Sequence, residues 1–495
     1  MPTYLFYDLE TTGLNPAFDQ ILQFAAIRTD EAFREMERHE LLVQLRPDVI
    51  PSPGAMLAHG IPIVKTLSGI SEYEATQKIH ALLNQPGTIS LGYNTLGFDN
   101  DFLRFAFHRN LLPPYTHQYA NDCGRMDLLP MVIIYWLYKS AVLRWPEVDG
   151  RVSLKLEHLK EANRLADGLA HDALVDVQAC LELAKRLARE KDIWSYLGDY
   201  FNKSDDLSRI NKLPPLSDAL PDSYKFGLVV DIDFGYKNNF QVPVLSLGHS
   251  LRYSNQSLWL RLDQPNLLET TAETVGETTR VIRKKYGEPG LLLPPYERYL
   301  AKIDSERARI LEENQTWLVE HPELLETISR YYREYAYPEV AEIDADAILY
   351  QMEFFSDADE ELCRQFHSVS LSEKINMVDN FASPVARELA RRILFRNYSH
   401  GLSDIFKAAL QNFMNKINPE SSKEALRDYK GNKRLTPARA LLQIKKLRDD
   451  DTLMDSQRTK LGELEAYLRS RFTIYEEEDD SENEGTESAN STSEI

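Results

Sequence analysis

The stretch Tyr4-Leu-Phe-Tyr-Asp8-Leu-Glu10-Thr-Thr-Gly13 decides how the first part of the chain is interpreted. Four apolar residues lead into two carboxylates two positions apart, and a Thr-Thr-Gly turn follows. Residues two apart in a strand project from the same face, so Asp8 and Glu10 should point together from the end of a buried strand. Adjacent carboxylates repel each other, and a hard divalent cation between them would let both stay ionised. A strand that merely ends in an acidic turn is the alternative.

Residues 1–195 show the pattern of a mixed α/β domain. Apolar runs predict strands at 4–9, 23–29, 40–46 and 88–91, with a hairpin-like connection between the second and the third. Apolar periodicity predicts helices at 71–83, 98–110, 154–165 and 172–190. Early strands followed by alternating helix and strand predict a mixed sheet flanked by helices.

Asp99 stands where the predicted helix 98–110 should present an apolar side chain. The positions three, four and seven residues further on are apolar, namely Phe102, Leu103 and Ala106. Asp99 therefore begins the buried stripe of this helix, and a bound metal would explain a carboxylate there. The alternative is that Asp99 caps the helix N-terminus.

Asp176 is a second carboxylate on a buried helical face. The core stripe of the helix 172–190 consists of Ala173, Val177, Cys180 and Ala184. Asp176 lies on the same side as Ala173, and an unpaired carboxylate there is costly unless it binds a cation. Asp172 faces away from that stripe and is predicted to cap the helix. His171 precedes the helix, where its ring could reach the same site or could be purely structural.

The rest of the chain divides into a linker, a small β-containing domain and a helical domain. Pro214, Pro215 and Pro221 mark residues 196–225 as a linker. Short strands are predicted at 226–231, 241–247 and 258–262. Residues 265–350 are predicted to be largely helical, with periodic apolar positions at 314–336. We expect domains at 1–195, 196–350 and 351–474, the last all-helical and opened by a cap at Ser356 or Asp357. Residues 475–495 are acidic and are predicted to be disordered.

Composition and charge set limits on the function. The chain has 495 residues, a net charge of −20 and three widely separated cysteines, which we interpret as reduced thiols of a cytoplasmic protein. We find no signal peptide and no run long enough to span a membrane. The segment from Lys407 to Arg448 carries eleven Lys and Arg against three acids, with Phe406, Phe413 and Tyr429 interleaved. This pattern suits single-stranded nucleic acid, and an ordinary basic helical face is the alternative.

The four acids and the histidine occur in the order D-x-E, N-x-x-x-F-D and H-D-x-x-x-D, which resembles the DEDD superfamily of 3′→5′ exonucleases in its histidine-containing subgroup. His59-Gly60-Ile61 is similar to a segment of that family that packs near the 3′-terminal nucleotide, although a turn is an equal reading. Further stretches resemble the bacterial exonuclease I family: 23–30, 92–99, 156–163, 354–359 and 396–398. The first motif, DLETTG, is closer to the wider superfamily, and residues 265–345 do not match in detail.

This resemblance implies a fold, a reaction and a set of site residues. The fold is a ribonuclease H-like exonuclease domain, a small SH3-like domain and a helical C-terminal domain around a groove for one strand. Two Mg²⁺ ions per site, replaceable by Mn²⁺, would be held by Asp8, Glu10, Asp99 and Asp176, with His171 as general base. Glu10 also belongs to the implied substrate contacts, which further include Thr11, His59, Gly60, Ile61, Asn94 and Phe98.

The implied activity is hydrolysis of single-stranded DNA to 5′-mononucleotides, in DNA repair and recombination. The implied partner is the single-strand DNA-binding protein, bound through its acidic C-terminal tail, and we expect a monomer. A 3′→5′ exoribonuclease or a proofreading-type exonuclease is the alternative enzyme. A nucleic-acid-binding scaffold with an inactive nuclease domain is the non-enzymatic alternative.

Overall fold

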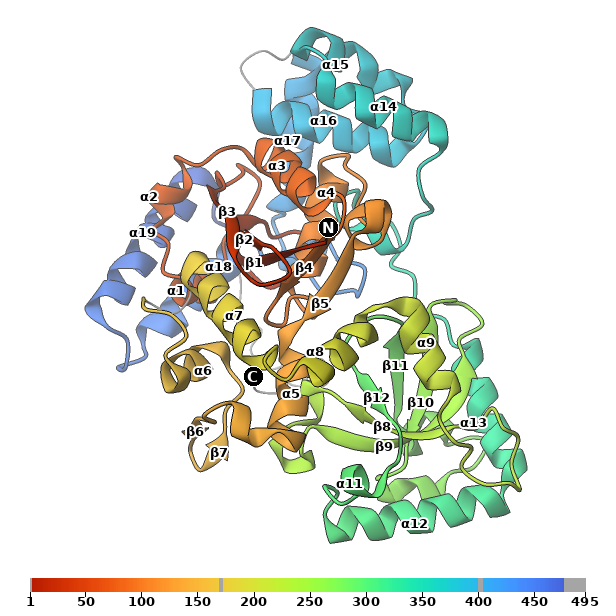
Figure 1. Ribbon diagram of the computed structural model, residues 1–495. Coiled ribbons are helices and arrows are strands. Elements are labelled where there is room, and N and C mark those ends of the chain that lie inside the picture. The colour runs from red at the N-terminus through yellow and green to blue at the C-terminus, as the bar shows by residue number, and fades with distance from the viewer. Residues whose placement is uncertain (1, 169–171, 399–403, 476–495) are drawn as a thin grey trace.

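The computed structural model describes residues 2–168, 172–398 and 404–475. Its N-terminal part contains a five-stranded sheet with the strand order β3-β2-β1-β4-β5 (Figure 1). Strand β2 pairs antiparallel with both β1 and β3, whereas β4 pairs parallel with β1 and β5 pairs parallel with β4. The strands are β1 Thr3–Thr11, β2 Ile21–Thr29, β3 Glu35–Leu42, β4 Thr88–Gly92 and β5 Gly124–Asp127. The mixed sheet predicted from the sequence is confirmed.

Helices cover both faces of this sheet because β1 is apolar on both sides. Leu5, Tyr7 and Leu9 pack with α3 and α4, whereas Phe6 shares a core with α5 and α7. Asp8 and Glu10 lie on the face of Phe6, so β1 directs them toward the α7 side. The helices of this part are α1 Pro53–Ala58, α2 Ile63–Thr66, α3 Glu72–Leu83, α4 Asp99–Arg109, α5 Leu128–Tyr138, α6 Leu156–Asn163 and α7 Ala173–Leu187.

Two regions of this part differ from the sequence prediction. The strand predicted at 40–46 is β3, which already begins at Glu35 and ends at Leu42. It is an exposed edge strand with mostly polar residues, so only its apolar C-terminal end showed the pattern of a strand in the sequence. Strand β5 and helix α5 were not predicted. Helix α5 is apolar nearly all round and buried, which removes the helical period from its sequence.

The middle of the chain forms a second sheet that is antiparallel throughout, with the order β11-β10-β9-β8-β12. Its strands are β8 Phe226–Val230, β9 Gln241–His249, β10 Gln256–Arg261, β11 Val281–Lys285 and β12 Leu291–Leu293. The first three confirm the predicted strands. The prediction that 265–350 is largely helical was wrong for β11 and β12, which are too short to show a clear alternation.

The helices around this second sheet also refine the prediction. They are α8 Lys191–Gly198, α9 Lys203–Asn211, α10 Val275–Thr278, α11 Glu297–Leu300, α12 Ser305–Glu320 and α13 Pro322–Glu334. Helix α9 lies inside the segment predicted as a linker. The periodic apolar positions at 314–336 fall on the end of α12 and the whole of α13, because Pro322 starts a new helix after His321.

The described C-terminal part is predominantly helical, as predicted, and returns to the N-terminal part. Its helices are α14 Asp357–Ser368, α15 Leu371–Met377, α16 Pro384–Tyr398, α17 Asp404–Ile417, α18 Pro437–Arg448 and α19 Asp455–Arg471. Ser356 caps α14 by accepting a hydrogen bond from the Asp359 N–H, which confirms one of the two predicted caps. Helices α14 to α17 form a separate group, while α18 and α19 lie against α1 and α2 (Figure 1).

Every helix among the described residues is too short or too polar to span a bilayer. The thiols of Cys123, Cys180 and Cys363 are free and buried, in agreement with the interpretation as reduced cysteines.

Buried ion pairs join the N-terminal part to helix α16, and we call them the ionic network. Arg396 Nη2 lies 2.8 Å from Asp48 Oδ2 and 2.6 Å from Asp346 Oδ2. Arg392 Nη1 lies 2.9 Å from Asp346 Oδ2, and Arg46 Nε lies 3.5 Å from Asp48 Oδ1. Each of these side chains is at most 5% exposed, so the interface is held by charges that neutralise one another within the protein.

Candidate active site

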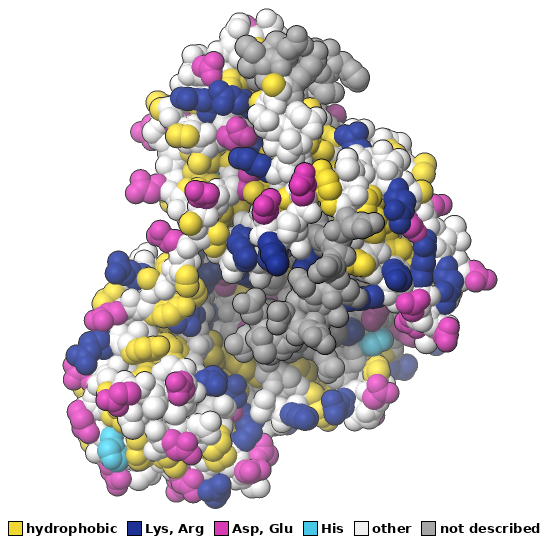
Figure 2. Space-filling view, turned by 180° about the vertical axis from the view of Figure 1, so that it is seen from behind, with side chains coloured by type: hydrophobic (Ala, Val, Ile, Leu, Met, Phe, Trp, Pro, Cys, Tyr) yellow, Lys and Arg dark blue, Asp and Glu magenta, His cyan; other side chains and the backbone are white. Residues whose placement is uncertain are grey.

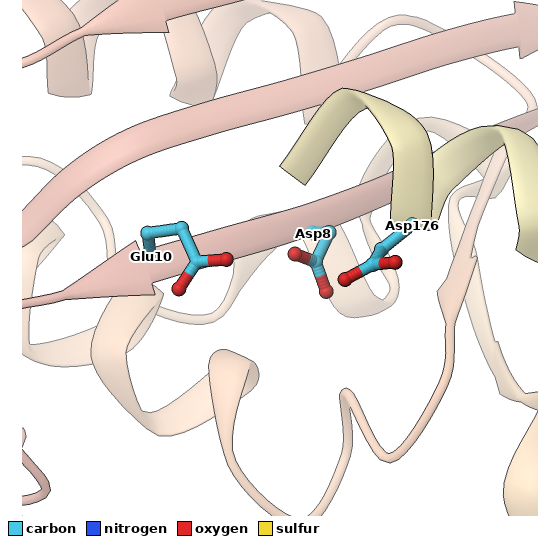
Figure 3. A group of neighbouring side chains, drawn as sticks. All are labelled: Asp8, Glu10 and Asp176. Carbon is cyan, nitrogen blue, oxygen red and sulfur yellow. The ribbon is translucent and has the colours of Figure 1, made fainter. Parts of the chain in front are cut away.

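Strand β1 and helix α7 bring three carboxylates together. Asp8 and Glu10 extend from the C-terminal half of β1, and Asp176 comes from the first turn of α7 (Figure 3). One oxygen from each of the three lies within 4.8 Å of the others. The shared strand face and the buried side of α7, both expected from periodicity, produce this cluster. We call these three residues the carboxylate cluster.

Asp99 reaches the same end of the sheet from the opposite helical layer. It is the first residue of α4 and is 5% exposed. The N-cap position belongs to Phe98, with no side-chain cap, so the alternative that Asp99 caps the helix is wrong. Asp99 Oδ1 is buried and has no hydrogen-bond partner among the described residues. Asp172, by contrast, caps α7 as predicted, because its Oδ1 accepts a hydrogen bond from the Leu174 N–H.

The carboxylates of this site oppose one another electrostatically. Burial, followed by the charges of Asp99 and Asp176, raises the pKa of Asp8 well above its ordinary value. Burial and then Asp8 and Asp176 raise the pKa of Glu10 to about 9. Burial also raises the pKa of Asp99, and the charges of Asp127 and Glu10 act in the same direction. The site therefore favours protons or bound cations over free carboxylates.

Two buried residues beside these carboxylates were missed by the sequence analysis. Lys160 Nζ lies 3.4 Å from Asp176 Oδ1. Lys160 follows Leu156 by four residues on the buried face of α6, and this position could have indicated it. The Asp127 carboxylate accepts hydrogen bonds from the backbone N–H groups of Asn94, Leu96 and Leu129, at 2.9, 2.9 and 3.0 Å. Asp127 thereby fixes the loop that leads into Asp99, a link that no local pattern reveals.

The residues predicted to contact substrate are distributed around this edge of the sheet. Thr11 Oγ1 donates a hydrogen bond to Gly13 O, and Phe98 packs on Phe102 with ring centroids 4.8 Å apart. Asn94 has a φ of 62°, a left-handed conformation that asparagine tolerates. His171, the predicted general base, lies outside the described residues.

The segment His59-Gly60-Ile61 is tied to the same edge and is approached by a lysine. The Ser52 N–H at the start of α1 donates to Thr12 O at 2.7 Å, which places α1 beside the loop after Glu10. Gly60, just after α1, has a φ of 66°, and a Cβ there would lie 2.6 Å from Lys460 Nζ of α19. Helix α19, the last helix among the described residues, thus places an ammonium group against this segment.

The basic segment 407–448 returns to the N-terminal part, although not every cation is available to a ligand. A cavity of about 340 Å³ between its 428–435 stretch and the loop after β1 is lined by Leu14, Asn15, Lys430 and Lys433, among others. Arg434 is 4% exposed and donates to Asp48 O, so it is a structural residue. The side chains of residues 404–407, which include Phe406 and Lys407 of the basic segment, lie outside the part of the chain that the structure describes. Figure 2 shows Lys and Arg side chains spread over this face, with Asp and Glu side chains among them.

Comparison with known proteins agrees with this architecture. The family model RNase_T, described as Exonuclease, matches residues 5–184. Exodeoxyribonuclease I of Escherichia coli (strain K12) is 32% identical over 375 residues, which cover 72% of this chain and 77% of that protein.

Two solved structures show the same order of an α/β exonuclease domain, an SH3-like domain and a helical C-terminal domain. The structure of E. coli exonuclease I in complex with a 5cy-dT13 oligonucleotide gives a TM-score of 0.82 at 25% identity, over 95% of this chain and 100% of that chain. The structure of SSB/exonuclease I in complex with the inhibitor CFAM gives a TM-score of 0.78 at 24% identity, over 95% of this chain and 100% of that chain. With the identity and coverage of the E. coli relative, the chain belongs to the exodeoxyribonuclease I family.

Proposed function

We propose that this protein is a 3′→5′ exodeoxyribonuclease that degrades single-stranded DNA to 5′-mononucleotides, in DNA repair and recombination. The observation that carries the proposal is the carboxylate cluster, with its oxygens within 4.8 Å, in a chain of the exodeoxyribonuclease I family. The solved E. coli relative that this fold resembles was crystallised with an oligonucleotide of thirteen deoxythymidines, which supports a single strand as substrate.

The residues at the site fit divalent metal ions. All the donors are carboxylate oxygens, which Mg²⁺ prefers and Mn²⁺ accepts. The buried Asp99 Oδ1 without a hydrogen-bond partner among the described residues also fits a site that a cation completes. Asp8, Glu10 and Asp176 would hold one ion, and Asp8 with Asp99 would serve a second. Bound ions would supply the activation of a water and the stabilisation of negative charge that an in-line displacement at phosphorus requires.

The other predicted residues would orient the DNA and move the proton. His171 would accept the proton of the attacking water, since an imidazole with an ordinary pKa near 6.5 suits this task at neutral pH. Glu10, Thr11, Asn94 and Phe98 would contact the 3′-terminal nucleotide, together with the segment 59–61. Lys460, which lies against Gly60, would provide a cation for a backbone phosphate beside that nucleotide.

Digestion of end-labelled DNA tests the proposal. Single strands labelled at the 5′ end should shorten stepwise in the presence of Mg²⁺, and strands labelled at the 3′ end should release a labelled mononucleotide at once. Chelation of the metal should stop both, and a blunt duplex should resist. Faster digestion of RNA than of DNA would favour the exoribonuclease, and binding of the strand without any cleavage would favour an inactive scaffold.

We also propose that a single-strand DNA-binding protein recruits this enzyme through its acidic C-terminal tail. One solved relative is a complex of exonuclease I with SSB. A cavity of about 440 Å³ between α16 and α17 offers the cations and the apolar ring that such a tail requires, since its lining includes Arg391, Arg392, Lys416 and Phe413, together with the acids Asp379 and Glu388. Fluorescence anisotropy with a labelled tail peptide should show binding that is lost when the last residues of the peptide are removed. Equal binding of both peptides would contradict this.

A further inference from the structure

Lys160 is a buried cation whose ion pair lies at the edge of the proposed metal site. Its side chain is 7% exposed, and its Nζ lies 3.4 Å from Asp176 Oδ1. Burial of an unpaired ammonium group is costly, so this position on α6 requires a carboxylate partner. Asp176 also belongs to the carboxylate cluster, and its carboxylate faces Asp8 (Figure 3). One carboxylate thus serves both Lys160 and the cluster.

The framework around Lys160 holds its ammonium group at a fixed place relative to α7. Arg186 of α7 donates a hydrogen bond of 2.6 Å to Asn163 O at the end of α6. The Asn163 side chain donates to Arg144 O at 2.7 Å and accepts from the Arg144 N–H at 2.8 Å. Helix α6 is therefore anchored on two sides within one turn of Lys160. A lysine placed by such a framework has little freedom to move away from Asp176.

We propose that Lys160 is a positioning residue of the metal site, which holds the Asp176 carboxylate in the orientation that binds a divalent ion. This inference rests on the proposed function, because it concerns the same site. Partners that orient a metal ligand typically account for about 10–100-fold in metal affinity. Nothing in the mechanism proposed above requires Lys160 to touch DNA.

The sign of the effect separates positioning from simple charge. A lysine acting only as a nearby positive charge repels the incoming ion, so its removal would tighten metal binding. A lysine that positions Asp176 does the opposite, since its removal leaves the carboxylate free to turn away from Asp8 and Glu10. The direction of the change in metal affinity therefore decides between these two roles.

The test is a calorimetric titration of Mn²⁺ into the metal-free and DNA-free full-length protein. The variant Lys160→Met should bind Mn²⁺ about 10–100-fold more weakly than the wild type. Lys160→Arg, which keeps a cation, should recover most of the affinity. Lys185→Met is the matched control, because Lys185 of α7 pairs with Glu182 on the surface, where the two side chains are 37% and 45% exposed. The control should leave Mn²⁺ affinity unchanged.

Digestion of single-stranded DNA at varied Mn²⁺ provides the second readout. In Lys160→Met the metal concentration for half-maximal rate should rise by the same factor as the dissociation constant, while the rate at saturating metal stays near that of the wild type. A merely structural role would instead lower the rate at every metal concentration. If Lys160→Met does not fold, Lys160→Arg and Lys160→Gln carry the same comparison.

The outcomes that contradict the inference differ from those that contradict the function. Unchanged or tighter Mn²⁺ binding by Lys160→Met, with normal binding by the wild type, would overturn the role of Lys160 alone. A wild-type protein that binds no Mn²⁺ would overturn the metal-dependent function and this inference with it.

Discussion

The carboxylate cluster and the ionic network are both buried and acidic, yet they have opposite electrostatics. In the network, burial by itself would raise the pKa of Asp48, but Arg396, Arg46 and Arg434 hold it below its ordinary value. The same holds for Asp346, whose main partners are Arg396 and Arg392. In the cluster, burial and neighbouring carboxylates both raise the pKa of Asp8.

This contrast separates a structural use of buried charge from a functional one. The network contains its own countercharges, so it is complete without a ligand and joins two parts of the chain. The cluster gathers carboxylates that the described cations only partly offset, chiefly through Lys160 at Asp176. Asp48 and Asp346 are neutralised by arginines of the protein, whereas Asp8 and Glu10 require protons or a cation from solution for the same purpose.

The largest expected effect is the loss of catalysis on removing one charge from the cluster. Asp8→Asn should lower the rate of single-strand digestion by at least about 1000-fold, because the group that places and balances the metal charge is gone. The variant should fold as well as the wild type or better, since it removes a repelling charge from a buried group. Rates at saturating Mg²⁺ and a urea unfolding curve measure both quantities.

Asp48→Asn makes the same chemical change in the ionic network and should have the reverse result. It leaves Arg396 with one carboxylate fewer, so the free energy of unfolding should fall. The rate per folded molecule should stay close to that of the wild type. If Asp8→Asn kept a normal rate, the assignment of Asp8 to the metal site would be wrong.

The next largest effect is expected on stability when an arginine of the network is removed. Arg396→Met removes the arginine that pairs with both Asp48 and Asp346. Loss of one partner of a buried ion pair lowers the free energy of unfolding by about 3–5 kcal/mol. Urea unfolding monitored by circular dichroism would measure the loss. Arg364→Met is the control, because its pair with Glu361 lies on the surface, where the two side chains are 67% and 51% exposed, and should contribute little to stability. Equal losses in the two variants would remove the distinction between the network and an ordinary surface pair.

Stability should depend on pH in opposite directions in the two regions. Glu10 has a folded-state pKa raised from 4.5 to about 9, so it binds its proton more tightly in the folded state. The metal-free protein should therefore lose stability as the pH rises from 4.5 through about 9. Asp48 has a lowered pKa, so its contribution is present above its ordinary value of 3.8 and is lost as the pH falls below it.

Thermal unfolding from pH 3 to pH 9, with and without Mg²⁺, would separate the two effects, which form an alkaline limb and an acid limb of the curve of stability against pH. Mg²⁺ binds the deprotonated carboxylates, so its stabilisation should grow as the pH rises. Glu10→Gln should flatten the alkaline limb alone, and Asp48→Asn the acid limb alone. An alkaline limb unchanged by both Glu10→Gln and Mg²⁺ would show that it arises elsewhere.

Local periods predicted the direction of each carboxylate, whereas their meeting in one site was implied by the resemblance to the DEDD exonucleases. The spacing of Asp8 and Glu10 places both on one strand face, and the position of Asp176 follows from the helical repeat of Ala173 and Val177. Amphipathic helices and strands were predicted correctly from their apolar periodicity. Helix α5, which is apolar nearly all round, and the three-residue strand β12 were not predicted.

Pairing between distant residues could not be predicted in the same way. Arg396 and Asp48 are 348 positions apart, so no local pattern connects them. Lys160 and Asp127 were missed for the same reason, since a period gives the buried face of a helix but not the partner that it meets. Arg434 belongs to the basic segment predicted to bind nucleic acid, but its guanidinium is buried and donates a hydrogen bond to Asp48 O.

The smallest expected effect concerns three lysines around the site that are exposed or half-buried. Lys430 and Lys433 line the cavity beside Leu14 and Asn15, and Lys460 lies against Gly60. Two segments of the C-terminal part, the stretch 428–435 and α19, thus place ammonium groups beside the loop after β1 and the segment after α1, although both are far from the cluster in sequence. Each phosphate contact with a single strand contributes a slope of about −0.7 to the dependence of log affinity on log salt.

Replacement of all three lysines by glutamine should therefore flatten that slope by up to about 2. The loss should be similar for every DNA sequence, because phosphate contacts carry no base information. The matched control replaces Lys78, Lys185 and Lys225, which pair with Glu74, Glu182 and Asp222, and so makes the same change in net charge away from these loops. Anisotropy titrations at several salt concentrations, in Ca²⁺ to prevent cleavage, give both slopes. If the two triple variants had equal slopes, the lysines would act through overall charge alone. If only the first flattened, the C-terminal part would hold the strand at these loops, whereas the buried arginines of the ionic network hold the protein together.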